Sequence, residues 1–284
     1  MTRDEEKLKG GVAVITGAGS GIGAGLARRA GELGMLVVVT DVNLPAAQAV
    51  AGEIVAAGGA AEAMLVDVSR PAELDRLADQ VFARHGSVRL LINNAGIETL
   101  GFAWDIPVDR WEATLNINLH GVIHGVRAFL PRMLESGAEA WVANLSSVGA
   151  FGMMPTQSAY TVTKHAVQSF SECLALEMQV KNAPVHVCSI IPGMMKTNIF
   201  SAEAGMGEPN DAERYRATMR DMMAHSGMEL AEGCRIIMEQ VAAGRFWASS
   251  QPDMTEALVA GRIAFLQGKA NPALAATHRE LLGI

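Results

Sequence analysis

The chain has 284 residues, of which 50% are hydrophobic and 19% are charged, so we expect a soluble globular protein with a substantial core and not a disordered chain. The net charge of -7, without any run of lysine and arginine, argues against a nucleic-acid-binding surface. Residues 1–9 are polar, and no apolar run reaches the roughly 18 residues of a membrane span. We therefore expect no membrane association and a cytoplasmic location.

Six short apolar runs rich in valine, isoleucine and leucine recur along the chain, and each is followed by a longer stretch with helical periodicity. This alternation predicts a single-domain α/β fold of the Rossmann type, in which a doubly wound parallel sheet lies between two helical layers and ligands bind at the carboxyl ends of the strands. The expected strands are Val12–Ile15, Met35–Val39, Ala63–Val66, Leu90–Ile92, Trp141–Leu145 and Val185–Ile191.

The sequence contains no repeat, low-complexity segment or linker, so we expect one domain over residues 1–284 with a core at about 8–250. Glycines at 205 and 207 and Pro209 predict a mobile substrate lid over about 194–228. A tail over about 250–284 either caps the site or extends a subunit interface.

A glycine-rich segment, Thr16-Gly-Ala-Gly-Ser-Gly-Ile-Gly23, joins the first strand to a helix expected over Ala24–Leu33. Glycines let the backbone approach a pyrophosphate at a helix N-terminus, where free N–H groups favour an anion. The position between strand and helix favours dinucleotide binding over a plain turn, although the spacing departs from GxGxxG. The predicted cofactor contacts are Gly17, Gly19, Ser20, Gly21, Ile22 and Gly23.

Acidic residues follow the second and third expected strands. Asp41 can accept both ribose hydroxyls of the cofactor and would repel a 2′-phosphate, which predicts NAD as the cofactor instead of NADP; alternatively, Asp41 caps the next helix. Asp67 and Val68 are predicted to contact the adenine, or Asp67 and Ser69 start the helix at Pro71.

Tyr160 and Lys164 are four residues apart in a stretch that is typical of a helix. Residues at this spacing share a helix face, so we expect the Lys164 ammonium to lower the pKa of the Tyr160 phenol from about 10 toward working pH. Such a pair is an acid–base catalyst. The same spacing also occurs on ordinary solvated helix faces, so other motifs must decide between the two interpretations.

Six motifs in order make the chain resemble the short-chain dehydrogenase/reductase family over about residues 8–250: the glycine segment, Asn93–Gly96, Asn118, Ser146-Ser147, Tyr160 with Lys164, and Pro192-Gly193. The resemblance implies a catalytic tetrad of Asn118, Ser147, Tyr160 and Lys164, with Ser147 chosen over Ser146 because it lies thirteen residues before Tyr160. It also implies further cofactor contacts from Asn94, Ala95, Gly96, Tyr160, Lys164, Pro192, Gly193, Met195 and Thr197.

The resemblance also implies the chemistry, an NAD-dependent interconversion of a secondary alcohol and a ketone. Tyr160 would be the base, Ser147 would hold the substrate oxygen, and Lys164 would also bind the nicotinamide ribose. Asn118 would hold a relay water, or its amide only satisfies a neighbouring backbone group. The alternatives are an NAD-binding regulator without turnover and a sugar-nucleotide epimerase or dehydratase, whose TGxxGxxG loop and larger C-terminal domain this sequence lacks.

The expected substrate wall is mostly apolar, and sixteen methionines in the chain suggest a pliable pocket for a bulky hydrophobic or aromatic uncharged alcohol, although core packing explains them nearly as well. Glu98 is also expected on this side. The predicted substrate contacts are Ser147, Gly149, Phe151, Met154, Gln157, Met194, Ile199 and Phe200.

Neither a metal site nor a disulfide is predicted. Cys173, Cys188 and Cys234 lie far apart without a CxxC pair, and His120 and His124 share a helix face but lack a third ligand. By family resemblance we expect a homodimer or homotetramer formed through second apolar faces of two helices, carried by Val122, Val126, Phe129, Val167, Phe170, Leu174 and Leu176.

Overall fold

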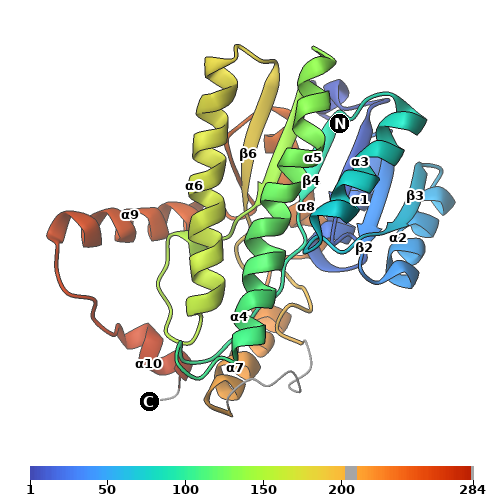
Figure 1. The fold of residues 1–284 in the computed structure, drawn as a ribbon. Coiled ribbons are helices and arrows are strands. Elements are labelled where there is room, and N and C mark those ends of the chain that lie inside the picture. Colours follow the sequence, from blue (N-terminus) through green and yellow to red (C-terminus); the bar gives the residue numbers. More distant parts are fainter. Residues whose placement is uncertain (202–209, 283–284) are drawn as a thin grey trace.

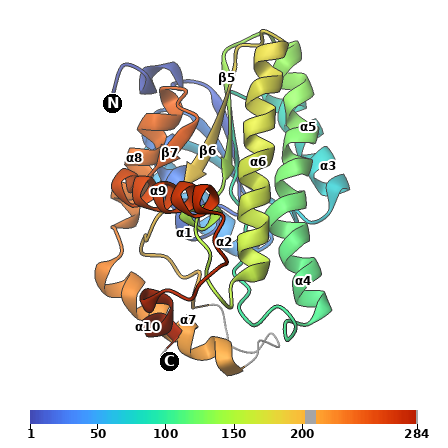
Figure 2. The ribbon, with the colours of Figure 1, turned by 90° about the vertical axis from the view of Figure 1, so that its left-hand side faces the viewer.

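The protein, represented by a computed structural model, is described over residues 1–201 and 210–282. Seven parallel strands form one sheet in the order β3-β2-β1-β4-β5-β6-β7, with helices on both faces (Figures 1 and 2). This confirms the single-domain, doubly wound α/β fold. The strands are β1 (Val12–Thr16), β2 (Leu36–Asp41), β3 (Ala60–Leu65), β4 (Leu90–Asn93), β5 (Ala140–Leu145), β6 (Val185–Ile191) and β7 (Trp247–Ser249).

The edge strand β7 is absent from the strands expected from the sequence. It has only three residues, too few to form a recognisable apolar run, and it exists because Trp247 and Ser249 pair with Ser189 and Ile191 of β6. The third strand begins at Ala60, earlier than expected, because the alanines that precede Ala63 pair with β2. Both differences come from pairing with a neighbour along the sheet edge.

Two hydrophobic cores lie on opposite faces of the sheet, because successive strand residues point to opposite sides. Ala13 and Ile15 of β1 face one core, and Val12 and Val14 face the other. Helices α1 (Gly21–Glu32), α2 (Leu44–Ala56) and α8 (Leu230–Ala242) cover the first core. Helices α3 (Pro71–His85), α5 (Gly121–Glu135) and α6 (Ser158–Val180) cover the second.

The residues expected to form a subunit interface on α5 and α6 mostly face the sheet, which corrects that prediction. The buried ones are Val122, Val126, Phe129, Val167 and Leu174, while Phe170 is half-buried. Leu176 is exposed, as are Val162 and Val180 on the same helix. Helical periodicity identifies an apolar face but does not say whether the sheet or another subunit covers it.

Four further α-helices are described, one before α5 and three after β6. α4 (Val108–Leu115) leads through a π-helical turn, η2 (Asn116–His120), into α5; α7 (Asn210–Ser226) precedes α8; and α9 (Pro252–Gly268) and α10 (Ala276–Leu282) end the described chain. α9 extends away from the sheet, and the chain returns to place α10 beside α7 (Figures 1 and 2).

The region expected to be a lid contains an apolar cluster, the lid cluster, whose buried members are Leu100, Phe200, Ala212, Tyr215 and Met223. Leu281 and Leu282 of α10 pack against it, so the C-terminal tail contacts the region that was expected to form the lid. The residues at 205, 207 and 209 that suggested mobility lie outside the described residues. In the part of the chain that is described, no helix is both long and apolar enough to cross a membrane.

Candidate active site

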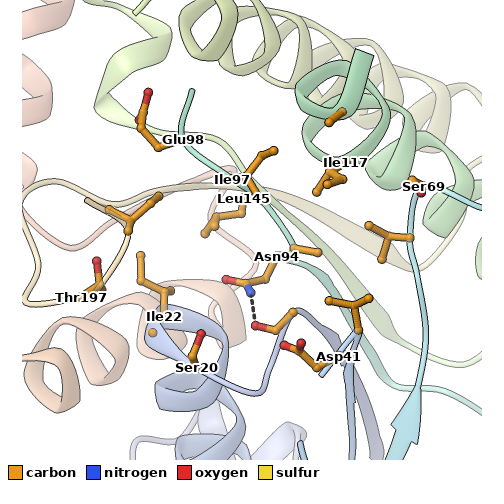
Figure 3. A pocket seen from close by; sticks show the side chains of 18 of the residues that line it. Ser20, Ile22, Asp41, Ser69, Asn94, Ile97, Glu98, Ile117, Leu145 and Thr197 are labelled. Carbon is orange, nitrogen blue, oxygen red and sulfur yellow. Dashed lines mark hydrogen bonds between the residues drawn. The ribbon is translucent and has the colours of Figure 1, made fainter. Parts of the chain in front are cut away.

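A cavity of about 610 Å³ opens at the carboxyl ends of the central strands (Figure 3). It brings the glycine segment, the acidic end of β2 and the Tyr160–Lys164 pair into one space, as the sequence predicted. The predicted site residues that line it are Gly17, Ser20, Gly21, Ile22, Asp41, Asp67, Val68, Asn94, Ala95, Gly96, Tyr160, Lys164, Pro192, Thr197 and Ile199.

The glycine segment needs its glycines for backbone conformation and for close approach. Gly17 and Gly21 have φ of 61° and 53°, in the left-handed region that glycine adopts without strain. A Cβ on Gly17 would lie 2.7 Å from Ala95 Cα, and one on Gly23 would lie 2.4 Å from Asn94 Nδ2. Asn94 Nδ2 donates to the Gly17 carbonyl over 3.0 Å (Figure 3). Gly23 therefore supports the segment from behind and does not line the cavity.

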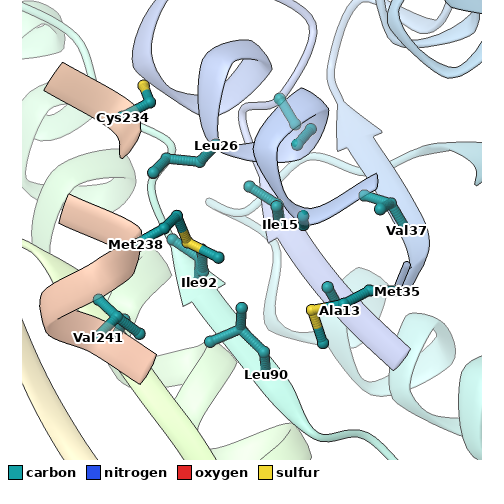
Figure 4. Packing of buried hydrophobic residues seen from close by; sticks show 14 of the residues in the cluster. Ala13, Ile15, Leu26, Met35, Val37, Leu90, Ile92, Cys234, Met238 and Val241 are labelled. Carbon is teal, nitrogen blue, oxygen red and sulfur yellow. The ribbon is translucent and has the colours of Figure 1, made fainter. Parts of the chain in front are cut away.

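Packing on the far side of α1 also fixes the glycine segment. A Cβ on Gly25 would lie 2.5 Å from the Cys234 Sγ, so α1 and α8 approach closely at this position. Below it, Leu26 packs against Met238 and Ile92 in the core on this face of the sheet (Figure 4). The N-terminus of α1 is thus held at the carboxyl end of β1, where its N–H groups face the cavity.

Asp41 holds the loop instead of capping a helix. Its Oδ2 accepts from the Gly19 amide over 2.9 Å, and its Oδ1 accepts from the Asn43 amide over 2.8 Å. The N-cap of α2 is Asn43, whose side chain accepts from the Ala46 amide. The interpretation of Asp41 as a helix cap is therefore wrong, and its carboxylate lines the cavity next to Gly19, which itself does not.

Asp67 also lines the cavity, and its carboxylate is engaged locally. Its Oδ1 accepts from the Ser69 amide and hydroxyl over 3.0 and 2.6 Å, and its Oδ2 lies 3.2 Å from Arg70 Nε. The N-cap of α3 is Arg70, without a side-chain cap bond. Asp67 therefore orders the turn before α3, and its contact with adenine stays a prediction.

Ser147 and Lys164 meet around Tyr160 at the other end of the cavity. The Ser147 Oγ accepts from the Gly149 amide over 3.0 Å and shares a hydrogen bond with the Tyr160 phenol. The Lys164 Nζ donates to the Leu145 carbonyl over 2.8 Å and lies 5.4 Å from the centre of the Tyr160 ring. The neighbouring serine, Ser146, instead donates to the Lys164 carbonyl over 3.3 Å, which supports the choice of Ser147.

The electrostatics of the pair differ from the sequence-based expectation. Burial raises the pKa of Tyr160 above its ordinary value, the charge of Glu98 raises it further, and the Ser147 hydrogen bond acts in the opposite direction. Burial lowers the pKa of Lys164 to about 8, against the opposing effect of Glu98. The expected lowering of the Tyr160 pKa by Lys164 is therefore not seen, because loss of solvent outweighs other influences on the phenol.

Asn118 lies in the η2 turn, where its side-chain amide makes three hydrogen bonds. Its Oδ1 accepts from the Ile97 amide over 2.8 Å, and its Nδ2 donates to the Ile97 carbonyl over 2.9 Å and to Thr163 Oγ1 over 3.3 Å. The side chain thus satisfies a backbone segment, as the simpler interpretation expected. A relay water at Asn118 stays a prediction.

The predicted substrate residues divide into two groups. Met154, Met194 and Ile199 pack against the lid cluster, which includes Phe200. Gly149 lies beside the catalytic pair, since a Cβ there would be 3.4 Å from the Tyr160 ring.

Two side chains that were predicted to contact the substrate or the cofactor point away from the cavity, which corrects those two predictions. The Phe151 ring stacks on Trp247 with centroids 5.2 Å apart and does not line the cavity. The Met195 side chain, predicted to contact the cofactor carboxamide, is buried in the core beneath α8, against Gly233. Gly193 also does not line the cavity; its amide donates to Ser250 Oγ.

The sequence analysis missed Tyr215, whose hydroxyl donates to Gln157 Oε1 over 3.1 Å. Its only signal in the sequence was its rarity, because the chain has two tyrosines and Tyr160 is the other.

The His120 and His124 rings lie 6.1 Å apart, and His120 Nδ1 bonds to Asn116 Oδ1. Across residues 1–201 and 210–282, no three His, Cys, Asp or Glu side chains are grouped to hold a metal ion.

Comparisons with known proteins agree with this geometry. The chain is 36% identical over 200 residues to the probable oxidoreductase EphD of Mycobacterium tuberculosis. This alignment covers 70% of this chain but only 33% of EphD, so the chain spans about a third of that relative's length. It is 34% identical over 196 residues to the cyclohexanol dehydrogenase of Acinetobacter sp., covering 69% of this chain and 77% of that protein.

Among solved structures, a short-chain dehydrogenase/reductase from Burkholderia phymatum in complex with NAD superimposes with a TM-score of 0.89 at 29% identity, covering 94% of this chain and 98% of that one. The family model for short chain dehydrogenases matches residues 11–206, which include the glycine segment, Ser147, Tyr160 and Lys164. The chain belongs to the short-chain dehydrogenase/reductase family.

Proposed function

We propose that the protein is an NAD-dependent oxidoreductase that interconverts a secondary alcohol and a ketone, with a bulky hydrophobic or aromatic substrate. The observation that carries this proposal is the juxtaposition in one cavity. The Tyr160 phenol, bonded to Ser147 and one helical turn from Lys164, lies at one end, and the glycine segment with Asp41 lies at the other. The residues that would transfer a proton and the residues that would bind the dinucleotide therefore line the same cavity, at its two ends.

The residues present fit NAD. The backbone at Gly17 and Gly21 leaves space beside the N-terminus of α1 for a pyrophosphate, and the N–H groups there favour an anion. The Asp41 carboxylate favours a ribose diol and disfavours a 2′-phosphate. When bound, NAD would supply the hydride acceptor of the oxidation. The complex of the Burkholderia phymatum relative with NAD supports the same choice.

The chain's own residues handle the proton and the substrate oxygen. During reduction the Tyr160 phenol donates its proton to the carbonyl oxygen. During oxidation the phenol must first release its own proton to solvent, and the resulting phenolate Oη then accepts the hydroxyl proton of the alcohol. Ser147 Oγ donates a hydrogen bond to the same oxygen and stabilises the charge that develops on it. Lys164, with its pKa lowered to about 8, is close to its own titration near neutral pH and can exchange a proton with little cost.

The substrate class is inferred from the walls of the site. Ile199 lines the cavity, and with Met154 and Met194 it packs against the lid cluster. Tyr215 of this cluster bonds Gln157, three residues before Tyr160. Such a wall stabilises a bulky apolar frame and offers little to a short charged hydroxy acid. The relative named cyclohexanol dehydrogenase, which bears the name of an uncharged ring alcohol, agrees with this class.

The test is turnover of a panel of aryl, alicyclic and short charged secondary alcohols, read as NADH absorbance. We expect the apolar members to be oxidised, and Tyr160→Phe to lose at least about a hundredfold in kcat while it retains NAD binding. Cys173→Ser, an exposed change on the same helix, is the control. NAD binding without turnover of any alcohol or ketone would favour the regulator, and a preference for short charged hydroxy acids would remove the proposed substrate class.

We also propose that the protein is a homodimer or homotetramer. The outer face of α6 exposes Val162, Leu176 and Val180 by 50%, 60% and 84%, and exposed apolar side chains on one helix favour a protein contact. Light scattering on the purified protein measures the mass directly. We expect Leu176→Glu with Val180→Glu to reduce the mass to that of a monomer, and a monomeric wild type would contradict the proposal.

A further inference from the structure

A carboxylate lies at the cavity that the chemistry above does not use. Glu98 is only 4% exposed, yet it is one of the residues that line the cavity (Figure 3). Tyr160 and Lys164 line the same cavity. Its backbone position is fixed on both sides: Asn118 bonds both the amide and the carbonyl of Ile97, and Thr99 Oγ1 bonds Thr114 Oγ1 over 2.7 Å. Burying a carboxylate is costly, so its fixed position beside the catalytic pair calls for a functional explanation.

A second polar group reaches the same region from α7. Tyr215 is 3% exposed, its ring packs edge-on against Phe200 with centroids 6.3 Å apart, and its hydroxyl donates to Gln157 Oε1 over 3.1 Å. Gln157 is the N-cap residue of α6 and lies three residues before Tyr160. The phenol of Tyr215 is thereby anchored to the start of the helix that carries the catalytic tyrosine.

The segment that carries Glu98 is joined to the same place. The Gly101 amide donates to the Thr156 carbonyl over 2.8 Å, and Gly101 forms a β-bridge with Gln157. The segment after β4, the residues before α6 and the lid helix α7 therefore meet beside Tyr160. Glu98, on the first of these segments, lines the cavity together with Tyr160.

The charges of these groups also affect one another's pKa values. The charge of Glu98 raises the pKa of Tyr160, of Tyr215 and of Lys164, and the charge of Tyr160 raises the pKa of Tyr215. The two phenols and the carboxylate therefore share one poorly solvated environment. A substrate that reaches Tyr160 must enter this environment too.

We propose that Glu98 and Tyr215 recognise a second polar group of the substrate, a hydrogen-bond donor close to the reacting carbon. A carboxylate offers about four acceptor sites, so Glu98 can accept from a substrate donor beside its other interactions. Tyr215 donates its proton to Gln157, which leaves its oxygen as an acceptor for the same donor. This inference rests on the proposed function and narrows its substrate to diols, hydroxy ketones or amino alcohols on an apolar frame.

Four benzylic alcohols that share one frame test this inference with the full chain and NAD: 1-phenylethanol, 1-phenyl-1,2-ethanediol, 2-amino-1-phenylethanol and mandelate. We expect kcat/KM for the diol or the amino alcohol to exceed that for 1-phenylethanol by about 10- to 100-fold, the range for a hydrogen bond to a charged group. Comparing kcat/KM for the diol with that for the amino alcohol shows whether the preferred donor is a hydroxyl or an ammonium group. Mandelate, which adds a carboxylate next to Glu98, should be the poorest substrate.

Variants show whether the preference comes from these two side chains. Glu98→Gln and Tyr215→Phe should each reduce the ratio of kcat/KM for the preferred substrate to that for 1-phenylethanol, by about tenfold or more for Glu98→Gln. Comparing ratios removes the intrinsic effect of the added group on alcohol reactivity. Glu213→Gln, an exposed carboxylate on α7, is the matched control and should leave the ratio unchanged. NADH binding by each variant verifies that it is folded.

The outcomes separate this inference from the proposed function. Equal kcat/KM for the substituted alcohols and 1-phenylethanol in the wild type, or a ratio retained in both variants, overturns the inference alone. Absence of turnover with every alcohol and ketone overturns the proposed function and the inference with it.

Discussion

Replacement of Asp41 tests how the protein chooses its cofactor, because this carboxylate has two separable roles. It presents a negative charge to the cavity, and it accepts bonds from the Gly19 and Asn43 amides. Asp41→Asn removes the charge but keeps a side-chain oxygen that can accept from Gly19. Asp41→Ala removes both. We expect both variants to shift preference toward NADP, and Asp41→Ala also to bind both cofactors less well.

The expected magnitude follows from the position of the charge. Two unit charges 4 Å apart interact by about 1 kcal/mol in bulk water and about 4 kcal/mol at an effective dielectric constant of 20. Asp41 is half-buried at the cavity, so its loss should change the ratio of NADPH to NADH affinity by between about fivefold and a thousandfold. Each lost bond to the carboxylate weakens the loop by about 1.5 to 3 kcal/mol in Asp41→Ala.

Fluorescence titration of NADH and NADPH gives both dissociation constants for each variant. Asp67→Asn is the matched control, since it removes another cavity carboxylate, one that we expect to face the adenine, which both cofactors share. Its affinity ratio should stay at the wild-type value. A ratio unchanged in both Asp41 variants would refute the reasoning, and a change in Asp41→Ala alone would attribute selectivity to loop geometry instead of charge.

Three further predictions concern the loop, the buried lysine and the core. Gly23→Ala should weaken NADH binding at least about tenfold in the same titration, because its Cβ would lie 2.4 Å from Asn94 Nδ2, whereas Gly52→Ala, with no atom within 4 Å, should not. Lys164→Met should be more stable than the wild type below pH 8, where the wild type buries a charged ammonium. Burial lowers the pKa of Lys164 in the folded protein to about 8, so this advantage should fade as the pH rises toward the unfolded pKa of about 10.4. A difference in the free energy of denaturant unfolding that does not depend on pH would contradict this prediction. Phe129→Ala should cost about 3 to 5 kcal/mol of unfolding free energy, since the ring is fully buried; a cost under about 1 kcal/mol in urea unfolding would contradict the packing.

Local patterns in the sequence were sufficient for the fold and for the cofactor end of the site. Alternating apolar runs and helical periodicity require only neighbours along the chain, and parallel strands then bring their carboxyl ends to one edge of the sheet. For that reason Gly17, Asp41 and Asn94 meet at the cavity where the sequence placed them. The Tyr160–Lys164 pair also depends on a spacing within one helix, which the sequence states directly.

The substrate end depended on contacts between distant segments. Tyr215 reaches Gln157 across 58 residues, and no local pattern specifies that pairing. The directions of Phe151 and Met195 were equally hidden, because a turn or a bridge decides which side of the backbone a side chain takes.

The tertiary structure also decided the electrostatics. Spacing along α6 predicted that Lys164 would lower the pKa of Tyr160, but burial and Glu98 raise it. A pKa depends on how much water a group loses and on which charges surround it, and both are set only when the whole chain has packed. The sequence by itself therefore determined the family and the fold and predicted the reacting groups, whereas the folded chain decided the direction in which their pKa values shift and the polar groups that surround them.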